Sequence, residues 1–155
     1  MRYVPEILFN MTEGYSVFSF GVGKKCNMQC GKSRVLNDLC FPVYDVNHKV
    51  FCEDDKTTFA SGQVDVFFEK KFESPRGFVL MDGQGKLTDD TIKNCLCLTN
   101  VALVHFHSSD LGNKKECEWL EKYLTWIRNN KPNKIRIILL IRDTMSAEFL
   151  KEPGD

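Results

Sequence analysis

The segment at residues 26–33 (CNMQCGKS) carries the residue types that bind a phosphate group in proteins. It follows an aromatic and β-branched run that predicts a strand, and it precedes apolar residues at helical spacing. It matches the pattern G-x-x-x-x-G-K-[S/T], except that Cys26 stands in place of the first glycine. In such a loop backbone N–H groups point at the phosphate, Lys32 places a cation on the β- and γ-phosphates, and the Ser33 hydroxyl binds Mg²⁺. The sequence therefore predicts a phosphate loop, and the alternative is that residues 31–33 only begin a helix.

Asp82 and Gly85 form a D-x-x-G motif directly after the apolar run at residues 77–81. That run predicts an inner strand, and ligands of parallel sheets bind beyond the carboxyl ends of the strands. The motif is therefore expected at the same sheet edge as the phosphate loop. There Asp82 would face Mg²⁺, and the backbone N–H of Gly85 would sense a γ-phosphate. An ordinary turn is the alternative interpretation of these two residues.

Two threonines, Thr57 and Thr58, lie in the polar segment at residues 44–61, which predicts a long, mobile loop. A threonine hydroxyl and carbonyl there could complete the coordination of Mg²⁺ and order the loop when a γ-phosphate is present. The sequence does not decide which of the two threonines does this. A solvated pair of threonines before a strand is the alternative.

Arg142 and Asp143 follow the apolar run at residues 135–141, which predicts the last strong strand. A carboxylate at this place can accept two hydrogen bonds, from the N1–H and the 2-amino group of guanine. Adenine would leave these polar groups unpaired, so Asp143 would select guanine. The alternative is that Asp143 caps the N-terminus of a helix.

Alternating strands and helices are expected to position these motifs. When crossover helices join parallel strands, helices lie on both faces of the sheet, so the pattern predicts an α/β domain with a mostly parallel sheet. Residues 63–71 alternate as in an edge strand, and residues 74–77 have the composition of a hairpin turn. The expected strands are 15–22, 63–71, 77–81, 101–106 and 135–141, and the expected helices are 32–41, 88–97 and 114–129.

The helix expected at residues 114–129 has a broad apolar face that includes Trp119, Tyr123 and Trp126. This aromatic stripe is expected to pack as core against the sheet. A surface that binds a partner protein is the alternative.

The composition predicts one globular domain across residues 1–155. Its 21 basic and 21 acidic residues give no long-range field to attract a polyanion, which argues against nucleic acid or an acidic membrane surface as the main partner. No apolar run is long enough for a transmembrane segment. Seven cysteines without a secretory signal indicate free thiols in a reducing, cytoplasmic setting, with a redox disulfide between Cys26 and Cys30 as the alternative.

The order of these motifs resembles the guanylate-binding branch of the dynamin-like large GTPases, and it is closest to the interferon-inducible very large GTPases. In those families an Arg-Asp pair replaces the more widespread Asn-Lys-x-Asp guanine motif, and residues 140–143 (LIRD) match it. Residues 29–37 (QCGKSRVLN) resemble their phosphate loop and the leucine and asparagine that follow it. The resemblance runs from about residue 15 to residue 143. It implies a three-layer P-loop NTPase (Ras-like) fold that binds GTP or GDP with Mg²⁺ as a conformational switch.

The resemblance also implies a role for each matching residue. The nucleotide-binding residues would be Cys26, Asn27, Met28, Gln29, Cys30, Gly31, Lys32, Ser33, Arg34, Gly85, Arg142 and Asp143. The catalytic residues would be Lys32, Gln29, Thr57 and Thr58, and the metal ligands would be Ser33, Thr57, Thr58 and Asp82.

Departures from the family pattern bear on activity. Guanylate-binding proteins carry an arginine in the phosphate loop that acts in cis, and Gln29 stands at that position. Such an arginine is worth roughly 10³ to 10⁵ in rate, so GTP hydrolysis is expected to be slow. The family places a further helix, strand and base-shielding loop beyond Asp143, so the G-type domain is expected to be C-terminally incomplete. A homodimer across the nucleotide face is one expected arrangement, and a nucleotide-free pseudo-GTPase that acts as a protein-interaction module is the alternative function.

Overall fold

The computed structural model of the chain describes residues 15–24, 26, 31–40, 51, 62–69, 78–130 and 135–142. No helix among them is long and apolar enough to span a membrane. The elements in chain order are β1 (Tyr15–Val22), α2 (Lys32–Cys40), β2 (Val64–Glu69), β3 (Phe78–Gly83), α3 (Asp89–Cys97), β4 (Val101–His107), the short 3-10 helix η1 (Ser108–Asp110), α4 (Lys114–Asn130) and β5 (Arg136–Arg142).

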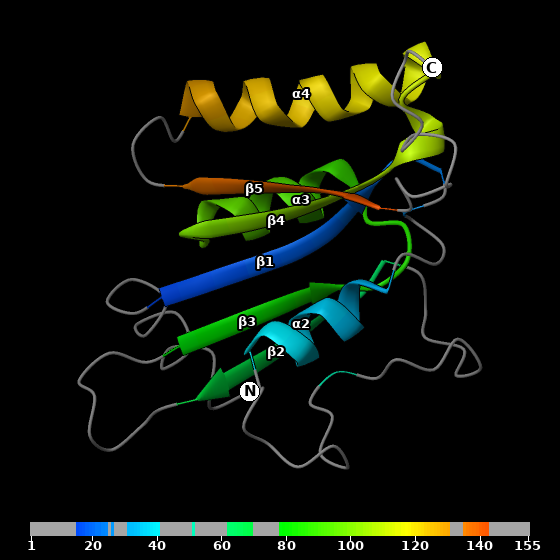
Figure 1. The fold of residues 1–155 in the computed structure, drawn as a ribbon. Helices are drawn as coiled ribbons and strands as arrows, with labels where there is room; N and C mark the ends of the chain where they lie inside the picture. Colours follow the sequence, from blue (N-terminus) through cyan, green and yellow to red (C-terminus); the bar gives the residue numbers. More distant parts are fainter. Residues whose placement is uncertain are drawn as a thin grey trace, which may run out of the picture.

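Within the described residues the strands form one sheet in the order β2-β3-β1-β4-β5 (Figure 1). β1 lies at its centre and runs parallel to β3 and β4, and β4 runs parallel to β5. β2 is antiparallel to β3 and lies at one edge, as its alternating sequence predicts. The predicted strands and helices are confirmed to within a few residues at their ends. The predicted hairpin turn at 74–77 and most of the predicted loop at 44–61 lie outside the described residues.

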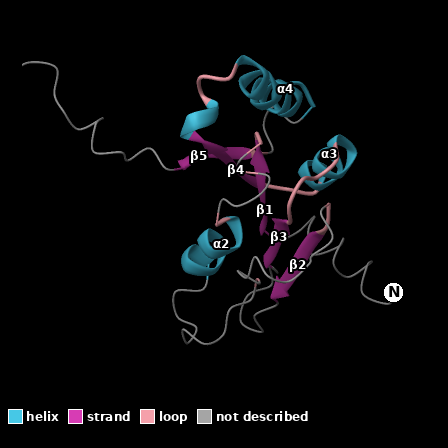
Figure 2. Ribbon diagram, turned by 90° about the vertical axis from the view of Figure 1, so that its right-hand side faces the viewer, coloured by secondary structure: helices cyan, strands magenta, loops and turns pink. Residues whose placement is uncertain are grey.

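Helices cover both faces of the sheet, as the alternation of strands and helices predicts (Figure 2). α2 packs against β1 and β3 on one face, and α3 and α4 pack against β1 on the opposite face. The chain therefore has an α/β fold with a mixed, mostly parallel sheet. We call the two sides the α2 face and the α3/α4 face.

The sequence of β1 sends different side chains to these two faces. Successive residues of a strand point to opposite sides, so Phe18 and Phe20 face α3 and α4, whereas Ser19 and Gly21 face α2. Phe18 and Phe20 stack with ring centroids 4.8 Å apart, and Phe20 meets the ring of Tyr123 from α4 edge-to-face at 6.0 Å. These rings form the centre of the larger hydrophobic core.

The α2 face holds a smaller apolar cluster, formed by the buried residues Leu36, Phe51, Leu80 and Leu103. Asn37 of α2 fixes Phe51 in this cluster. Its side-chain amide donates to the Phe51 carbonyl at 2.9 Å, and its side-chain oxygen accepts from the Phe51 N–H at 3.0 Å. A buried amide with both groups bonded holds its neighbour without leaving polar atoms unpaired.

α4 follows the predicted aromatic stripe only in part. Tyr123 and Ile127 are buried, and Trp126 packs against the larger core, but the Trp119 side chain is 38% exposed. The prediction that Trp119 belongs to the core is wrong, because a pocket between α3 and α4 leaves its ring partly uncovered. Helical spacing shows which residues share a face, but it does not show how far the neighbouring elements cover that face.

α3 begins at a capped end that also ties it to α4. Thr88 is extended, and its hydroxyl accepts from the Thr91 N–H at 3.2 Å, which satisfies one of the unpaired donors of the first turn. The next residue, Asp89, interacts favourably with the helix dipole. Asp89 also accepts a hydrogen bond from the Tyr123 hydroxyl at 2.6 Å and forms an ion pair with Lys122.

β5 forms the second edge of the sheet and carries exposed apolar side chains on both faces. Ile137, Leu139 and Ile141 share one face, Ile138 lies on the other, and all four are more than a third exposed. The apolar run therefore forms the predicted strand, although it is less covered than the other strands of the sheet.

Candidate functional site

The N-terminus of α2 and the carboxyl end of β3 meet at one edge of the sheet. The Ser33 hydroxyl donates to Oδ2 of Asp82 at 2.5 Å, although the two residues are 49 positions apart in the sequence. They meet because β3 lies beside β1 and runs parallel to it, so the end of β3 and the segment that follows β1 reach the same edge. The structure thus brings together two residues for which the sequence predicts a magnesium site.

Asp82 is fully buried, and only one of its two carboxylate oxygens is hydrogen-bonded. Oδ2 also accepts from Gln84 Nε2 at 2.7 Å, whereas Oδ1 has no hydrogen-bond partner in the described part of the chain. Burial raises the pKa of Asp82 to about 6, and the hydrogen bond from Ser33 and the charge of Lys32 oppose this rise. A cation or donor that reached Oδ1 would stabilise the buried carboxylate.

Lys32, the first residue of α2, directs its ammonium group back at the segment that precedes the helix. The side chain is buried, and Nζ donates to the Cys26 carbonyl oxygen at 3.0 Å. Burial lowers the pKa of Lys32, and the charge of Asp82 raises it. A cation held away from bulk water interacts more strongly with an anion than an exposed cation does. We call Lys32, Ser33, Asp82 and Gln84 the α2 site.

Cys26, which replaces the first glycine of the phosphate-loop pattern, is buried against β1. A Cβ atom on Gly21 would lie 2.3 Å from the Cys26 carbonyl oxygen, so the return of the chain onto β1 requires glycine at position 21. Cys26 takes part in a disulfide bond whose second cysteine lies outside the described side chains. The prediction of free thiols is therefore wrong for Cys26, while Cys95, Cys97 and Cys117 form no disulfide bond. Composition and compartment indicate the usual state of a thiol, but not which cysteines the fold brings together.

Arg142, at the end of β5, reaches the start of α2. Its Nη2 atom lies 3.2 Å from the position that a Cβ atom would take on Gly31, and Gly31 has a φ of +59°. The positive φ and the nearby guanidinium both favour glycine at this position. The structure therefore places Arg142 beside the predicted phosphate loop.

Two polar residues near Asp82, Gln84 and Asp65, are not among the residues predicted from the sequence. Gln84 Nε2 lies 3.2 Å from Asp65 Oδ2 and 3.4 Å from Ser33 Oγ. Asp65 stands opposite Asp82 in the register of β2 and β3, and its charge contributes to the raised pKa of Asp82. Gln84 occupies one of the two unspecified positions of the D-x-x-G motif. Its place inside this motif is the sequence signal that could have identified it as a site residue. Nothing in the sequence indicates the register that brings Asp65 to the site.

A buried histidine lies close to the charged groups of the site. His105 of β4 is fully buried, its Nε2 atom is 3.0 Å from the Ser19 hydroxyl of β1, and its Nδ1 atom has no partner among the described residues. Burial lowers the pKa of His105 to about 4, and the charges of Lys32 and Arg142 contribute to this shift. The imidazole is therefore neutral at pH 7.

The side chains gathered at this edge fit Mg²⁺. They offer the Ser33 hydroxyl and the carboxylates of Asp82 and Asp65, which are oxygen donors, and Asp82 Oδ1 is unpartnered. Mg²⁺ prefers oxygen, and it is commonly held by one or two carboxylates together with substrate phosphates and water. In the described ranges no group of three or more His, Cys, Asp or Glu side chains could hold a metal ion.

Seven predicted site residues lie outside the described residues, and their roles stay predictions: Asn27, Met28, Gln29, Cys30, Thr57, Thr58 and Asp143. Of the remaining predicted residues, Gly85 has a φ of +60° in the turn after β3. Arg34 lies on the exposed side of α2, where it pairs with Asp38 at 3.5 Å.

Models of known protein families and curated proteins show no match to this chain. Its function must therefore be inferred from the site itself.

Proposed function

We propose that the chain binds a guanine nucleotide together with Mg²⁺ in a P-loop NTPase (Ras-like) domain of the dynamin-like large GTPase kind. The observation that carries the proposal is the meeting of Lys32, Ser33 and Asp82 at the N-terminus of α2. A cation, a hydroxyl group and a carboxylate at a helix N-terminus are the groups that bind a nucleotide phosphate with its magnesium ion. The order and direction of the strands are compatible with this fold.

The described residues would change partners when nucleotide binds. In this structure Lys32 bonds to the Cys26 carbonyl and Ser33 bonds to Asp82. With nucleotide, Lys32 would turn its ammonium group to the β- and γ-phosphates, and Ser33 would offer its oxygen to the metal. Asp82 would then orient a metal-bound water. Bound Mg²⁺ would neutralise charge on the phosphate oxygens.

The remaining roles concern base selection and switching. Asp143 would accept hydrogen bonds from guanine, next to Arg142, which lies beside Gly31. Thr57 or Thr58 would complete the metal site, and closure of their segment on a γ-phosphate would make the domain a conformational switch. Gln29 is neutral, so the loop lacks a cation there and GTP hydrolysis would be slow.

Thermal unfolding of the full chain with GTP, GDP and ATP, each with and without Mg²⁺, tests the proposal. At a hundredfold excess over Kd, a ligand stabilises the folded state by about 3 kcal/mol. We expect this stabilisation with GTP and GDP in the presence of Mg²⁺, and little of it with ATP. An equal effect of ATP would contradict guanine selection by Asp143 but leave the phosphate site intact.

Lys32→Met is the decisive variant, because it removes the ammonium group and keeps the alkyl chain. We expect the GTP-dependent stabilisation to disappear while the free protein still unfolds cooperatively. Lys114→Met is the matched control, since the Lys114 side chain is 92% exposed at the start of α4. It should bind GTP like the wild-type protein. Stabilisation by GTP that persists unchanged in Lys32→Met would overturn the proposal.

A nucleotide-free pseudo-GTPase that acts as a protein-interaction module is the second candidate, and the disulfide at Cys26 favours it. A loop held by a covalent bond is less free to close around phosphates. The stabilisation by GTP is therefore measured before and after reduction with dithiothreitol. No effect in either state would support the interaction module. An effect only after reduction would support nucleotide binding in a reducing, cytoplasmic setting, and sedimentation with and without GTP then tests the homodimer.

A further inference from the structure

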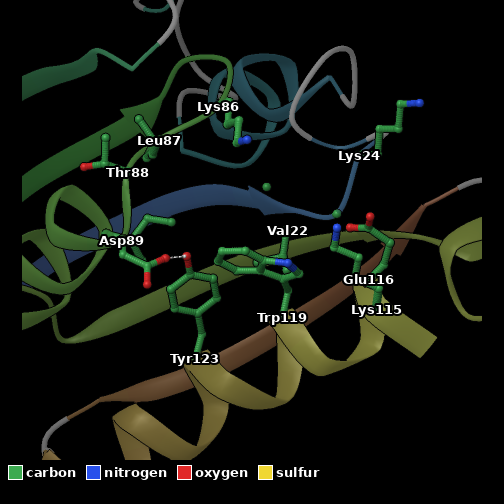
Figure 3. A pocket seen from close by; sticks show the side chains of 13 residues that line it. Val22, Lys24, Lys86, Leu87, Thr88, Asp89, Lys115, Glu116, Trp119 and Tyr123 are labelled. Carbon is green, nitrogen blue, oxygen red and sulfur yellow. Dashed lines mark hydrogen bonds between the residues drawn. The ribbon is translucent and has the colours of Figure 1, made fainter. Parts of the chain in front are cut away.

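A pocket lies between α3 and α4 at the carboxyl end of β1 (Figure 3). Its volume is about 630 Å³, which is in the range of small-molecule sites. Its walls are the end of β1 with the residues that follow it, the loop before α3, and the first half of α4. It is distinct from the α2 site, because Ser33 and Asp82 lie on the opposite face of the sheet.

The floor of the pocket is aromatic and apolar. The indole ring of Trp119 lies across it and the ring of Tyr123 stands beside it, with centroids 6.2 Å apart (Figure 3). Leu87 and Ile92 add aliphatic surface from the side of α3. Because Trp119 is 38% exposed, a flat ring placed on it would bury apolar surface that the fold itself leaves uncovered.

The carboxylate of Asp89 lines the pocket but is already paired. It accepts a hydrogen bond from the Tyr123 hydroxyl at 2.6 Å and forms an ion pair with Lys122. The hydrogen bonds from Lys122 and Tyr123 hold the pKa of Asp89 below its ordinary value. The negative charge of Asp89 is therefore balanced by Lys122, which does not line the pocket.

Three lysines line the same pocket from three different segments: Lys24, Lys86 and Lys115. Figure 3 shows Lys86 and Lys115 on opposite sides of the cavity. Among the described residues of the lining, Glu116 is the only other acidic one. The Lys115 ammonium group forms no ion pair with any described residue. With Asp89 paired to Lys122, Lys24 and Lys115 outnumber Glu116, the remaining carboxylate of the described lining.

We propose that this pocket binds a small organic anion that carries a flat ring. The ring would stack on Trp119, and the anionic group would bind the ammonium group of Lys115. Lys24 would add to the positive potential at the rim. A neutral ring gains only the stacking, and a cation is repelled. This site does not depend on nucleotide binding at the α2 site, because the two lie on opposite faces of the sheet.

Two-dimensional NMR of the ¹⁵N-labelled full chain with 2-naphthoate tests the proposal. The chain has two tryptophans, so the indole N–H signals of Trp119 and Trp126 report separately. We expect the Trp119 signal to shift and saturate, and the Trp126 signal to stay in place because Trp126 does not line the pocket. A ligand of this size is expected to have a Kd on the order of 1 mM. The neutral analogue 2-naphthalenemethanol should bind about fivefold more weakly, because it lacks the charge-assisted hydrogen bond.

Variants show which group holds the anion. Lys115→Met should raise the Kd of 2-naphthoate about fivefold and leave the Kd of the neutral analogue unchanged. Lys114→Met, on the adjacent exposed residue, and Lys32→Met, in the α2 site, should both bind 2-naphthoate like the wild-type protein. Three results would overturn the proposal: no saturable shift of Trp119, equal binding of the neutral analogue, or loss of 2-naphthoate binding in Lys32→Met. The last result would place the probe in the α2 site and would leave the nucleotide proposal untouched.

Discussion

The two faces of the central sheet differ in how many polar side chains they bury. On the α3/α4 face, β1 contributes Phe18 and Phe20 to a large core of stacked and edge-to-face rings. On the α2 face, the same strand contributes Ser19, and its neighbours contribute Asp82 and His105, all of them fully buried. The α3/α4 face therefore stabilises the fold, whereas the α2 face adds buried polar atoms, at some cost in stability, to its smaller apolar cluster.

Typical free energies show how differently the two kinds of buried side chain affect stability. Burying a phenylalanine side chain stabilises a protein by about 1.5 to 3 kcal/mol. A buried polar group left without a hydrogen bond costs about 1 to 3 kcal/mol. Oδ1 of Asp82 and Nδ1 of His105 are both without partners among the described residues. A face that keeps such atoms is the expected place for a functional site.

The largest expected effect is on the stabilising face. Phe20→Ala removes a fully buried ring that contacts Phe18 and Tyr123, so we expect a loss of about 3 to 5 kcal/mol in the free energy of unfolding, measured by urea denaturation. Val17→Ala, on the α2 face of the same strand, should cost only about 1 kcal/mol. Equal losses in the two variants would contradict the difference between the faces.

Asp82→Asn is expected to stabilise the metal-free protein. The pKa of Asp82 is about 6 in the folded chain, above its ordinary 3.8, so its charge opposes folding above pH 6 and has no effect below pH 3.8. Asparagine is always neutral, so the variant should gain up to about 3 kcal/mol at pH 7.5. The gain should vanish near pH 4. Chemical denaturation in EDTA across this range measures it, and a destabilised variant at pH 7.5 would show that the carboxylate is structural.

His105→Leu should change the pH dependence in the opposite direction. The pKa of His105 is about 4 in the folded chain, below its ordinary 6.5, so its contribution to stability is present above pH 6.5 and lost as the pH falls toward 4. Leucine removes this loss, which amounts to up to about 3 kcal/mol between pH 7 and pH 4. In the wild-type protein the shifts of Asp82 and His105 oppose each other, so together they give a shallow pH dependence between pH 4 and 6. The variant should therefore gain stability as the pH falls from 6 to 4, and a pH dependence as shallow as that of the wild-type protein would contradict the buried, neutral imidazole.

The smallest expected effect comes from Ser19→Ala, which removes the hydroxyl group beside His105 Nε2. Both ring nitrogens would then lack partners, so we expect a cost of about 1 to 2 kcal/mol. The matched control is Ser109→Ala, because Ser109 is exposed and lies 2.8 Å from Nδ1 of His107. That change should stay within about 0.5 kcal/mol. Thermal unfolding measures the loss of stability in each variant. Equal losses would show that removing the hydroxyl group beside the buried His105 costs no more than removing the one beside His107.

Local pattern and chain order predict much of the fold and part of the site. The aromatic and β-branched run of β1 and the apolar run of β3 predict these strands, because each signal lies within a few neighbouring residues. The rule that parallel strands end at a common edge predicts that Ser33 and Asp82 lie close together. The disagreement at Trp119 arises because coverage of a helix face depends on neighbouring elements and not on spacing within the helix.

The residues that the sequence does not predict depend on long-range register. Asp65 reaches Asp82 because β2 pairs with β3 in one register among several, and a shift by one residue would turn it to the other face. Ser19 and His105 are 86 positions apart in the sequence, and they meet because β1 pairs with β4. No period or motif encodes such pairs, so only the folded chain reveals them.

The uncovered strand at the end of the sheet has a practical consequence for handling the protein. Within the described residues β5 pairs only with β4, so its outer edge offers backbone donors and acceptors to another chain. In an antiparallel pair of two such strands, Arg136 of one copy would stand near Arg142 of the other, and like charges there oppose association. Added salt screens this repulsion. Concentrated samples should therefore stay dispersed in dilute buffer and begin to cluster as the ionic strength rises.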